Sequence, residues 1–388
     1  MQRVKWLTSL QQVSAAQWDS LFADDNPFCR HSFLLALEQG GSVDSGNSQY
    51  NTGWSSQHLT LWQGDILLAA VPGYIKSHSY GEYLFDWQIA DAYRQFNLNY
   101  YPKWIAAIPF TPVCGPRLGL RNTTEHEMVL ALLCEALQQG LTEQRYCSVQ
   151  WLYTCEQMQQ SLSRHGFLAR HDVQFLWYNT GYHQFDDYLQ RLTARKRKQI
   201  RHERRSSSGF SIRTLHGHQL SPLHWQAIVR CYQATYLKRS GHHGYISSDS
   251  FMQIGRSMAD NLVVFAAFSD DASQDIIAMA LCFRSADTLY GRYWGTLTDA
   301  DCLHFELCYY QGIEYCISHQ LRYFDAGAQG EHKLKRGFVP VTRYGSYCFA
   351  DTPLSPAIAD YFSQETKHLS QYTAQAMLAL PYKDIATD

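Results

Sequence analysis

The feature that most constrains this fold is an alternation of helical and strand patterns that recurs along the chain. Over residues 124–178 a helix, a strand, a second helix and a second strand follow one another, with Gly140 and Gly166 at the breaks. From about residue 181 the same order returns at larger scale. Strands that alternate with helices favour a mixed sheet flanked by helices. The pattern therefore predicts an α/β (α+β) protein with two domains, 1–180 and 181–388.

The second half begins with a basic helix, expected over 184–206. Later strands are expected at 262–268, 276–283 and 288–295, followed by a helix at 303–319 and a strand at 322–326. A hairpin over Asp270–Gln274 joins the first two of these strands. At 388 residues the chain is long enough for two domains, and no low-complexity linker separates the halves.

Bulk properties narrow the function classes. A net charge of −2 argues against a chain that binds nucleic acid or membrane surfaces over its whole extent, although a local basic patch remains compatible with it. The 11 cysteines form no CxxC pair, so we expect reduced thiols and no metal site. The N-terminus lacks the apolar core of a signal peptide, and no run of eighteen apolar residues occurs. We expect a soluble, cytoplasmic protein.

A glycine-rich segment, DAGAQGEHKLKRGFVPV at 325–341, directly follows an apolar strand. Backbone amides next to cationic side chains suit the oxygens of phosphates or carboxylates. The segment predicts an anion site formed by Gly327, Gly330, Lys333, Lys335 and Arg336. A tight polar turn with solvated lysines explains the same composition, and the segment matches neither the Walker pattern nor GxGxxG.

The segment 72–91 mixes polar and large aromatic side chains irregularly around Gly81. An exposed edge strand would alternate polar and apolar residues instead. Apolar walls with a few convergent polar groups are typical of binding pockets. The segment therefore predicts a pocket, and a surface loop is the alternative. Its candidate residues are Lys76, His78, Tyr80, Glu82, Asp86, Trp87 and Asp91.

A third cluster combines YGRYWG at 290–295 with His304 and Glu306 at the start of the next helix. A carboxylate and an imidazole there could serve as general base and orienting group for an attacking amine. Residues two apart on a helix point in different directions, which argues against a shared metal ion. A capping or core role for His304 is the alternative.

The segment RKRKQIRHERR at 195–205 is almost entirely basic. Such a helix would suit a polyanion, either tRNA or the phosphates of coenzyme A. A solvated helix face is the alternative. No recognition-helix motif accompanies it, so we expect no DNA binding.

Five blocks together resemble the FemAB-like peptidoglycan biosynthesis/recognition proteins of bacteria. They are KSHSYGEYLFDW at 76–87, FTPVCGPR at 110–117, RKRKQIRHER at 195–204, HFELCYYQGIEY at 304–315 and DAGAQGEHK at 325–333. The resemblance runs from about residue 26 to 350. It implies a tandem fold of the acetyltransferase (GNAT) superfamily.

The resemblance also implies an activity. Fem transferases move an amino acid from aminoacyl-tRNA onto the amine of a peptidoglycan precursor. This chain shows neither their long coiled-coil arm nor the pyrophosphate loop of acetyltransferases that bind coenzyme A. The donor is therefore expected to be either acyl-coenzyme A or aminoacyl-tRNA.

We expect direct acyl or aminoacyl transfer to an amine, with no covalent enzyme intermediate. Glu306 or Glu82 is the expected base, with His78 and His304 as relay or orienting groups. Substrate contacts are expected from Lys76, Tyr80, Asp86, Trp87, Arg292, Trp294, Gln329, Glu331 and His332. The alternatives are a non-catalytic recognition module for a peptidoglycan fragment, peptide or tRNA, and an RNA-binding protein that uses the basic helix.

Overall fold

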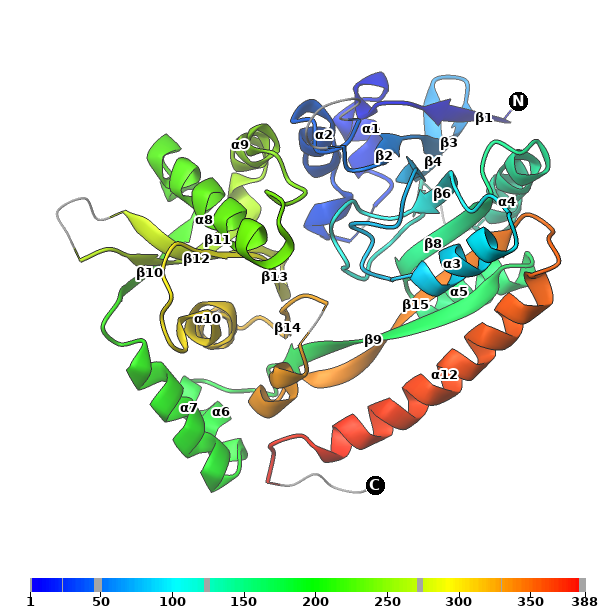
Figure 1. Ribbon diagram of the computed structural model, residues 1–388. Helices are drawn as coiled ribbons and strands as arrows, with labels where there is room; N and C mark the ends of the chain where they lie inside the picture. The colour runs from blue at the N-terminus through cyan, green and yellow to red at the C-terminus, as the bar shows by residue number, and fades with distance from the viewer. Residues whose placement is uncertain are drawn as a thin grey trace. The chain divides into compact units, whose positions relative to one another are not determined.

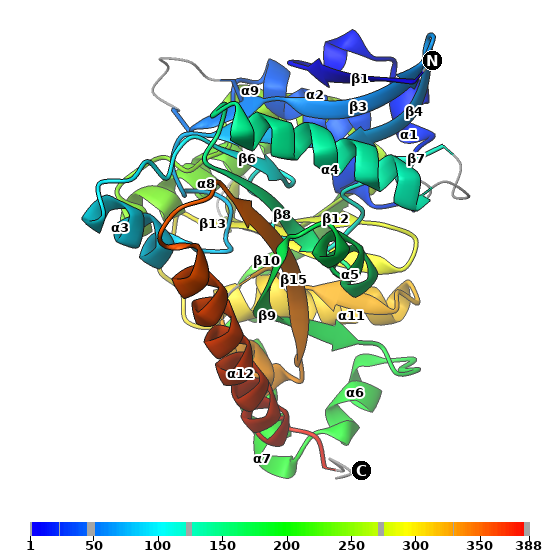
Figure 2. The same ribbon diagram turned by 90° about the vertical axis from the view of Figure 1, so that its right-hand side faces the viewer.

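The computed structural model (Figures 1 and 2) describes residues 2–22, 24–44, 51–121, 126–270, 275–328 and 330–383. The chain forms two compact units. Unit 1 holds Met1–Val173, Tyr245–Gln253 and Thr342–Gln371, and unit 2 holds Gln174–Gly244, Ile254–Val341 and Tyr372–Asp388. These units differ from the two contiguous domains expected from the sequence, because two later segments return to pack in unit 1.

The main sheet of unit 1 contains one parallel pair. Its order is β2 (Trp54–Ser56), β5 (Gly73–Lys76), β6 (Lys103–Ala106), β8 (Ser148–Thr154) and β15 (Val339–Phe349). Only β6 and β8 run parallel, and the other neighbours are antiparallel. The crossover between the parallel strands carries helix α4 (His126–Thr142), because parallel neighbours need a long connection.

Unit 2 repeats this order. Its strands are β10 (Ser211–His216), β11 (Leu262–Phe268), β12 (Ile276–Arg284), β13 (Thr288–Thr296), β14 (Tyr323–Asp325) and β9 (Leu168–Tyr178). Again one pair is parallel, β13 with β14, and the others are antiparallel. Apart from β10, each strand has a counterpart in unit 1. The recurring pattern in the sequence therefore corresponds to a repeated sheet.

The last strand of each sheet arrives from the other half of the chain. Strand β9 follows β8 in sequence but pairs with β14 of unit 2, and β15 follows β14 but pairs with β8 of unit 1. These pairings are long-range, and no local pattern in the sequence indicates them.

A second sheet in unit 1 is entirely antiparallel. It contains β1 (Gln2–Leu7), β3 (His58–Gln63), β4 (Ile66–Val71) and β7 (Gly119–Leu120), in that order. Gln63 and Ile66 pair with each other where the chain turns from β3 into β4. The remaining helices of unit 1 are α1 (Ala15–Asp19), α2 (His31–Gln39), α3 (Trp87–Gln95) and α5 (Glu156–Arg164), together with most of α9 (Ser248–Ser257) and α12 (Ser355–Leu378).

Helices cover both faces of the unit 2 sheet. Helix α8 (Pro222–Ser240) lies on one face, and α10 (Leu303–Phe305) and α11 (Gln311–Ser318) lie on the other (Figures 1 and 2). Local signals fix the ends of α8. At the start of the helix, the Ser221 side chain accepts a hydrogen bond from the backbone amide of His224, and Pro222 occupies the first turn. At its end, Gly241 adopts a left-handed conformation with a φ of 71°.

The basic segment is not one helix over 184–206. It forms α6 (Phe185–Arg191) and α7 (Ala194–Ser206), because Leu192 and Thr193 adopt extended backbone angles between them. Leu192 is fully buried and forms an isolated bridge with Tyr382. That tertiary contact overrides the helical pattern at this point. The tip of the hairpin expected over Asp270–Gln274 lies outside the described residues.

Each unit has its own apolar core. In unit 1 it includes Trp104, Trp151 and Leu133, and in unit 2 Trp177, Phe265 and Phe324. Within the described part of the chain, no helix is both long and apolar enough to cross a membrane.

Candidate active site and binding clusters

In unit 2, the parallel strands β13 and β14 pair along only part of the length of β13. They pair from Thr288–Tyr323 to Tyr290–Asp325, where their pairing ends among the described residues. On its other side β13 shifts register against β12, so that Arg292 is an extra residue between Gly291 and Tyr293. Such a β-bulge bends a strand and increases its local twist. From Gly291 to Thr296, the part called here the released half, β13 does not pair with β14 among the described residues.

A cleft of about 500 Å³ lies beside this released half of β13. It is lined by Ala234, Thr235, Lys238, Arg239, Trp294, Thr296, Leu297, Thr298 and Asp299, from α8 and from the end of β13. Gly295 permits the close approach of these elements, because an added Cβ would lie 2.3 Å from the carbonyl carbon of Cys231. A volume of this size accommodates a small ligand or the reactive arm of a larger one.

Two histidines, His304 and His332, follow Trp294 in a series of neighbouring rings. The rings of Trp294 and His304 are 5.1 Å apart between centroids, and those of His304 and His332 are 6.0 Å apart. The Nε2 atom of His332 lies 2.7 Å from the Tyr309 hydroxyl. Burial lowers the pKa of His304 to about 3, and the positive charge of Arg239 lowers this pKa further. Burial also lowers the pKa of His332, so both rings are neutral near pH 7.

Glu306 does not face an open site. It lies in a π-helical segment (Glu306–Tyr310), its residue is only 3% exposed, and it accepts hydrogen bonds from Arg204 Nη2 at 3.0 Å and Gln311 Nε2 at 2.8 Å. Arg204 also pairs with Glu314 at 2.8 Å. The Glu306 carboxylate therefore ties α7 to the helix that follows β13.

The glycine-rich turn is held from inside by its cations. Lys333 is buried and donates to the Gly327 carbonyl at 2.5 Å. Arg336 is buried, pairs with Glu203 at 2.6 Å and lies 3.7 Å from the centroid of the Phe305 ring. These two side chains are therefore neither solvated, as the polar-turn alternative required, nor at the surface to meet a phosphate.

The rest of that turn is placed differently. Lys335 is exposed, and Gly327 and Gly330 have φ angles of 88° and 113°, which favour glycine. Glu331 is exposed and accepts a hydrogen bond from the Tyr372 hydroxyl at 3.0 Å. Gln329 lies outside the described residues.

The expected pocket of unit 1 contains a buried ionic cluster. Lys103 of β6, fully buried, pairs with Glu82 Oε2 at 2.8 Å and Asp86 Oδ2 at 2.5 Å. Tyr100 donates to the same Asp86 oxygen at 2.5 Å. Both carboxylates were expected from the sequence, but Lys103 was not. A lysine that opens the apolar segment KWIAAIPF was the available signal.

Lys76 completes this cluster. Its ammonium donates to the carbonyls of Thr52 and Tyr80, each at 2.9 Å, and lies over the Trp54 ring. Burial lowers the pKa of Lys76 to about 7 and raises the pKa of Glu82 to about 7. Glu82 Oε1 and Asp86 Oδ1 are buried without a hydrogen-bond partner among the described residues. The cluster therefore anchors the loop 77–86 from beneath.

Aromatic side chains stand on the outer side of that loop. Tyr80, Phe85 and Trp87 are exposed, and Tyr80 and Trp87 meet edge to face with centroids 4.7 Å apart. His78 contacts Tyr80, and burial together with the charge of Lys76 lowers its pKa to about 4. A neutral imidazole and three exposed rings give this loop the composition of a ligand-binding surface.

No group of three or more His, Cys, Asp or Glu side chains within the described ranges is placed to hold a metal ion.

Comparison with known proteins agrees with this architecture. The family model for FemAB-like proteins, described as peptidoglycan biosynthesis/recognition, matches residues 9–384. The chain belongs to the FemAB-like family. No curated protein matches it.

Two solved structures share the fold of this FemAB-like chain. The C-terminal domain (DUF2156) of a protein named as a lysylphosphatidylglycerol synthetase, from Agrobacterium fabrum, aligns with a TM-score of 0.53 at 10% identity. That alignment covers 92% of this chain and 96% of the other. FemX aligns with a TM-score of 0.53 at 10% identity, over 92% of this chain and all (100%) of FemX. The FemAB-like chain therefore shares the fold of these two proteins, and its mixed α/β class is the one that its sequence predicted.

Proposed function

We propose that this FemAB-like chain transfers an acyl or aminoacyl group to an amine, which attacks the donor carbonyl directly. The observation that supports this best is the cleft beside the released half of β13. It brings Arg239 and Trp294 to one wall, with His304 in ring contact with Trp294. Donor and acceptor held together there would react without the entropic cost of a bimolecular encounter.

In this mechanism the amine nitrogen forms a bond to the donor carbonyl carbon and loses a proton, and the ester or thioester bond to the carrier breaks. We propose His332 as the base, because its imidazole is neutral near pH 7, partly exposed and hydrogen-bonded to Tyr309. The proton passes to the departing oxygen or sulfur. Backbone amides near Gly327 and the Arg292 side chain are the proposed partners of the oxyanion.

This assignment replaces Glu306 and Glu82 as bases. Both carboxylates accept hydrogen bonds from cations inside their own units. Both carboxylates are also buried, so neither meets an open acceptor site from which it could take a proton. The same observation favours a second candidate function, a recognition module that binds an amine-bearing peptidoglycan fragment, a peptide or tRNA without turnover.

The proposal also names an acceptor, a donor and a cellular location. The family description supports an amine of a peptidoglycan precursor as acceptor. Resemblance to Fem transferases supports aminoacyl-tRNA as donor, and the GNAT fold supports acyl-coenzyme A. Eleven free cysteines suit a reducing compartment, so we propose a cytoplasmic location.

The test is transfer by the full-length protein from labelled acetyl-coenzyme A, longer acyl-coenzyme A species and charged tRNA to a panel of amines. His332→Asn should lower kcat by about a hundredfold, whereas His368→Ala, at an exposed histidine of α12, should leave it unchanged. Binding of donor and amine without any transfer would contradict the transferase and support the recognition module.

A further inference from the structure

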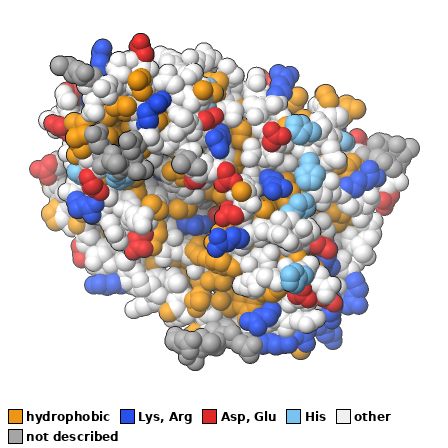
Figure 3. Space-filling model, turned by 180° about the vertical axis from the view of Figure 1, so that it is seen from behind, with side chains coloured by type: hydrophobic (Ala, Val, Ile, Leu, Met, Phe, Trp, Pro, Cys, Tyr) orange, Lys and Arg blue, Asp and Glu red, His pale blue; other side chains and the backbone are white. Residues whose placement is uncertain are grey.

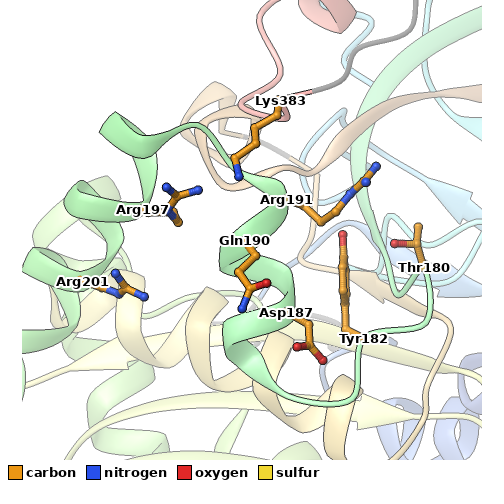
Figure 4. A pocket seen from close by; sticks show the side chains of 8 residues that line it. All are labelled: Thr180, Tyr182, Asp187, Gln190, Arg191, Arg197, Arg201 and Lys383. Atoms are coloured by element: carbon orange, nitrogen blue, oxygen red, sulfur yellow. The ribbon is translucent and has the colours of Figure 1, made fainter.

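A basic pocket in unit 2 shares no lining residue with the cleft beside β13. It occupies about 860 Å³ at the corner between α6 and α7. Its walls are Thr180, Tyr182, Asp187, Gln190, Arg191, Arg197, Arg201 and Lys383 (Figure 4). Four of these eight side chains are cations and one is an anion, in a chain whose net charge is −2.

Tertiary contacts build this corner. The C-terminal segment pairs with the extended link between the two helices: the Thr193 amide donates to the Pro381 carbonyl at 2.9 Å, and the Lys383 amide to the Arg191 carbonyl at 2.9 Å. Leu192 is buried beneath the link. Lys383 is thereby fixed beside helices that lie far away in the sequence.

The arginines of α7 are aligned toward the pocket. Arg197 and Arg201 are four residues apart, so they lie on the same face of the helix, one turn from each other. Figure 4 shows their guanidinium groups on the side of α7 that faces α6, with the Lys383 side chain extending toward Gln190. Arg197 Nη1 donates to the Leu192 carbonyl at 2.9 Å, which fixes the direction of its guanidinium group.

The acidic groups nearby do not neutralise these charges. The Asp187 carboxylate accepts hydrogen bonds from the backbone amides of His183 and Gln184 and so caps α6. These hydrogen bonds lower the pKa of Asp187. Asp186 approaches Arg201 only at 3.4 Å, in an exposed pair. Like charges held together by a folded scaffold are relieved by a bound anion, and guanidinium groups match phosphate oxygens in geometry.

The positive surface continues beyond the pocket. Arg195, Lys198 and Arg205 of α7 are exposed. In Figure 3, blue side chains gather at the lower right, where α7 lies. The 13 residues of α7 extend over about 20 Å at the usual helical rise. This length suits a ligand that carries more than one phosphate.

We propose that the α6–α7 corner binds phosphate groups of an organic phosphate ligand, with Arg197, Arg201 and Lys383 as the contacting cations. If the proposed transfer function holds, this ligand is the carrier of the donor. Two sources share the chemistry, the phosphates of coenzyme A and the phosphodiester backbone of an RNA. This assignment moves the expected phosphate contacts from Lys333 and Arg336, which are buried, to the α6–α7 corner.

The test measures binding to the full-length protein by calorimetry and fluorescence anisotropy, with three probes: inorganic pyrophosphate, coenzyme A and a labelled RNA stem-loop. The wild type should bind at least one organic probe saturably. Arg197→Ala/Arg201→Ala should weaken that binding about tenfold or more. The control Arg256→Ala/Lys367→Ala removes two exposed cations from α9 and α12 and should change it less than about twofold.

Lys383→Ala provides a second variant at an exposed residue near the chain end, where folding is least affected. It should weaken the same probe by a smaller factor. Tight coenzyme A binding with weak RNA binding identifies the small carrier, and RNA binding whose affinity falls steeply with salt identifies a nucleic-acid carrier. Either result supports the pocket.

Two outcomes overturn the proposal: no saturable binding of coenzyme A or RNA by the wild type, or equal binding by wild type and both pocket variants. Because these measurements need no turnover, they are separate from the transferase assay. Intact phosphate binding without transfer would reject the reaction and leave the pocket standing. Transfer by the wild type together with unchanged binding in the pocket variants would support the reaction and reject the pocket.

Discussion

Lys76 and Lys103 lie directly opposite each other on the antiparallel strands β5 and β6, and both side chains are fully buried. Like charges in that position destabilise a sheet. The carboxylates of Glu82 and Asp86, which come from the loop after β5, offset the repulsion by pairing with Lys103. The geometry of the loop 77–86 thus depends on four buried titratable side chains.

Lys103→Met should lower the free energy of unfolding by about 3–5 kcal/mol, because it leaves two buried carboxylates without their cation. Chemical denaturation of purified variants measures this. Arg94→Ala breaks an exposed pair with Asp91 and should cost less than about 1 kcal/mol. Equal losses in the two variants would show that the buried cluster does not stabilise unit 1.

Glu82→Gln should change how stability depends on pH. Burial raises the pKa of Glu82 from 4.5 to about 7. Its neutral form therefore contributes stability that is fully present below pH 4.5 and is lost as the pH rises through 7. Glutamine cannot ionise, so the variant should gain stability relative to wild type across that window. Urea titrations at several pH values measure the difference, and a constant difference would contradict the raised pKa.

Gly295→Ala should distort the cleft beside β13. The added methyl would overlap the backbone of Cys231 on α8, and overpacking of this kind costs about 1–3 kcal/mol. Gly209→Ala is the matched control, because its Cβ would meet no atom within 4 Å and its φ is not positive. Thermal unfolding should separate the two variants clearly. A Gly295→Ala protein as stable as the control would show that α8 can move away from β13 at little cost.

Glu306→Gln separates a structural carboxylate from a catalytic one. Loss of the charge weakens the pair with Arg204, which is 3.0 Å away and partly exposed, so the free energy of unfolding should fall by about 1–3 kcal/mol. Turnover per folded molecule should stay within about twofold of wild type, unlike that of His332→Asn. A hundredfold loss of kcat with unchanged KM would restore Glu306 as the base.

The sequence predicted much of the secondary structure, because capping residues, glycine breaks and apolar spacing act locally. The strands expected at 262–268 and 276–283 are confirmed by β11 and β12. The predicted basic helix was wrong in one respect, since burial of Leu192 against the C-terminal segment divides it. That contact joins residues too far apart for any sequence window.

The candidate sites were predictable in part for the same reason. Lys76, Glu82 and Asp86 could be grouped from the sequence because they lie close together in segment 72–91. Lys103 is distant in sequence and reaches them only because β6 pairs with β5. Likewise, Arg197 and Arg201 belong to a basic run that the sequence shows directly. Nothing local in the sequence indicates that Lys383 lies in the same pocket. The turn at 325–341 had the composition of a phosphate site, yet packing buried Lys333 and Arg336 within it.

By itself the sequence determined the α/β class, the repeat of that class in two halves and membership of the FemAB-like family, because these depend on residue order and local periodicity. Tertiary structure alone decided that β9 and β15 complete sheets in the opposite halves, that Lys76 faces Lys103, and that Lys383 meets the arginines of α7. Each of these depends on burial and pairing between distant segments, where the energy of a contact is set by neighbours that the local sequence does not specify.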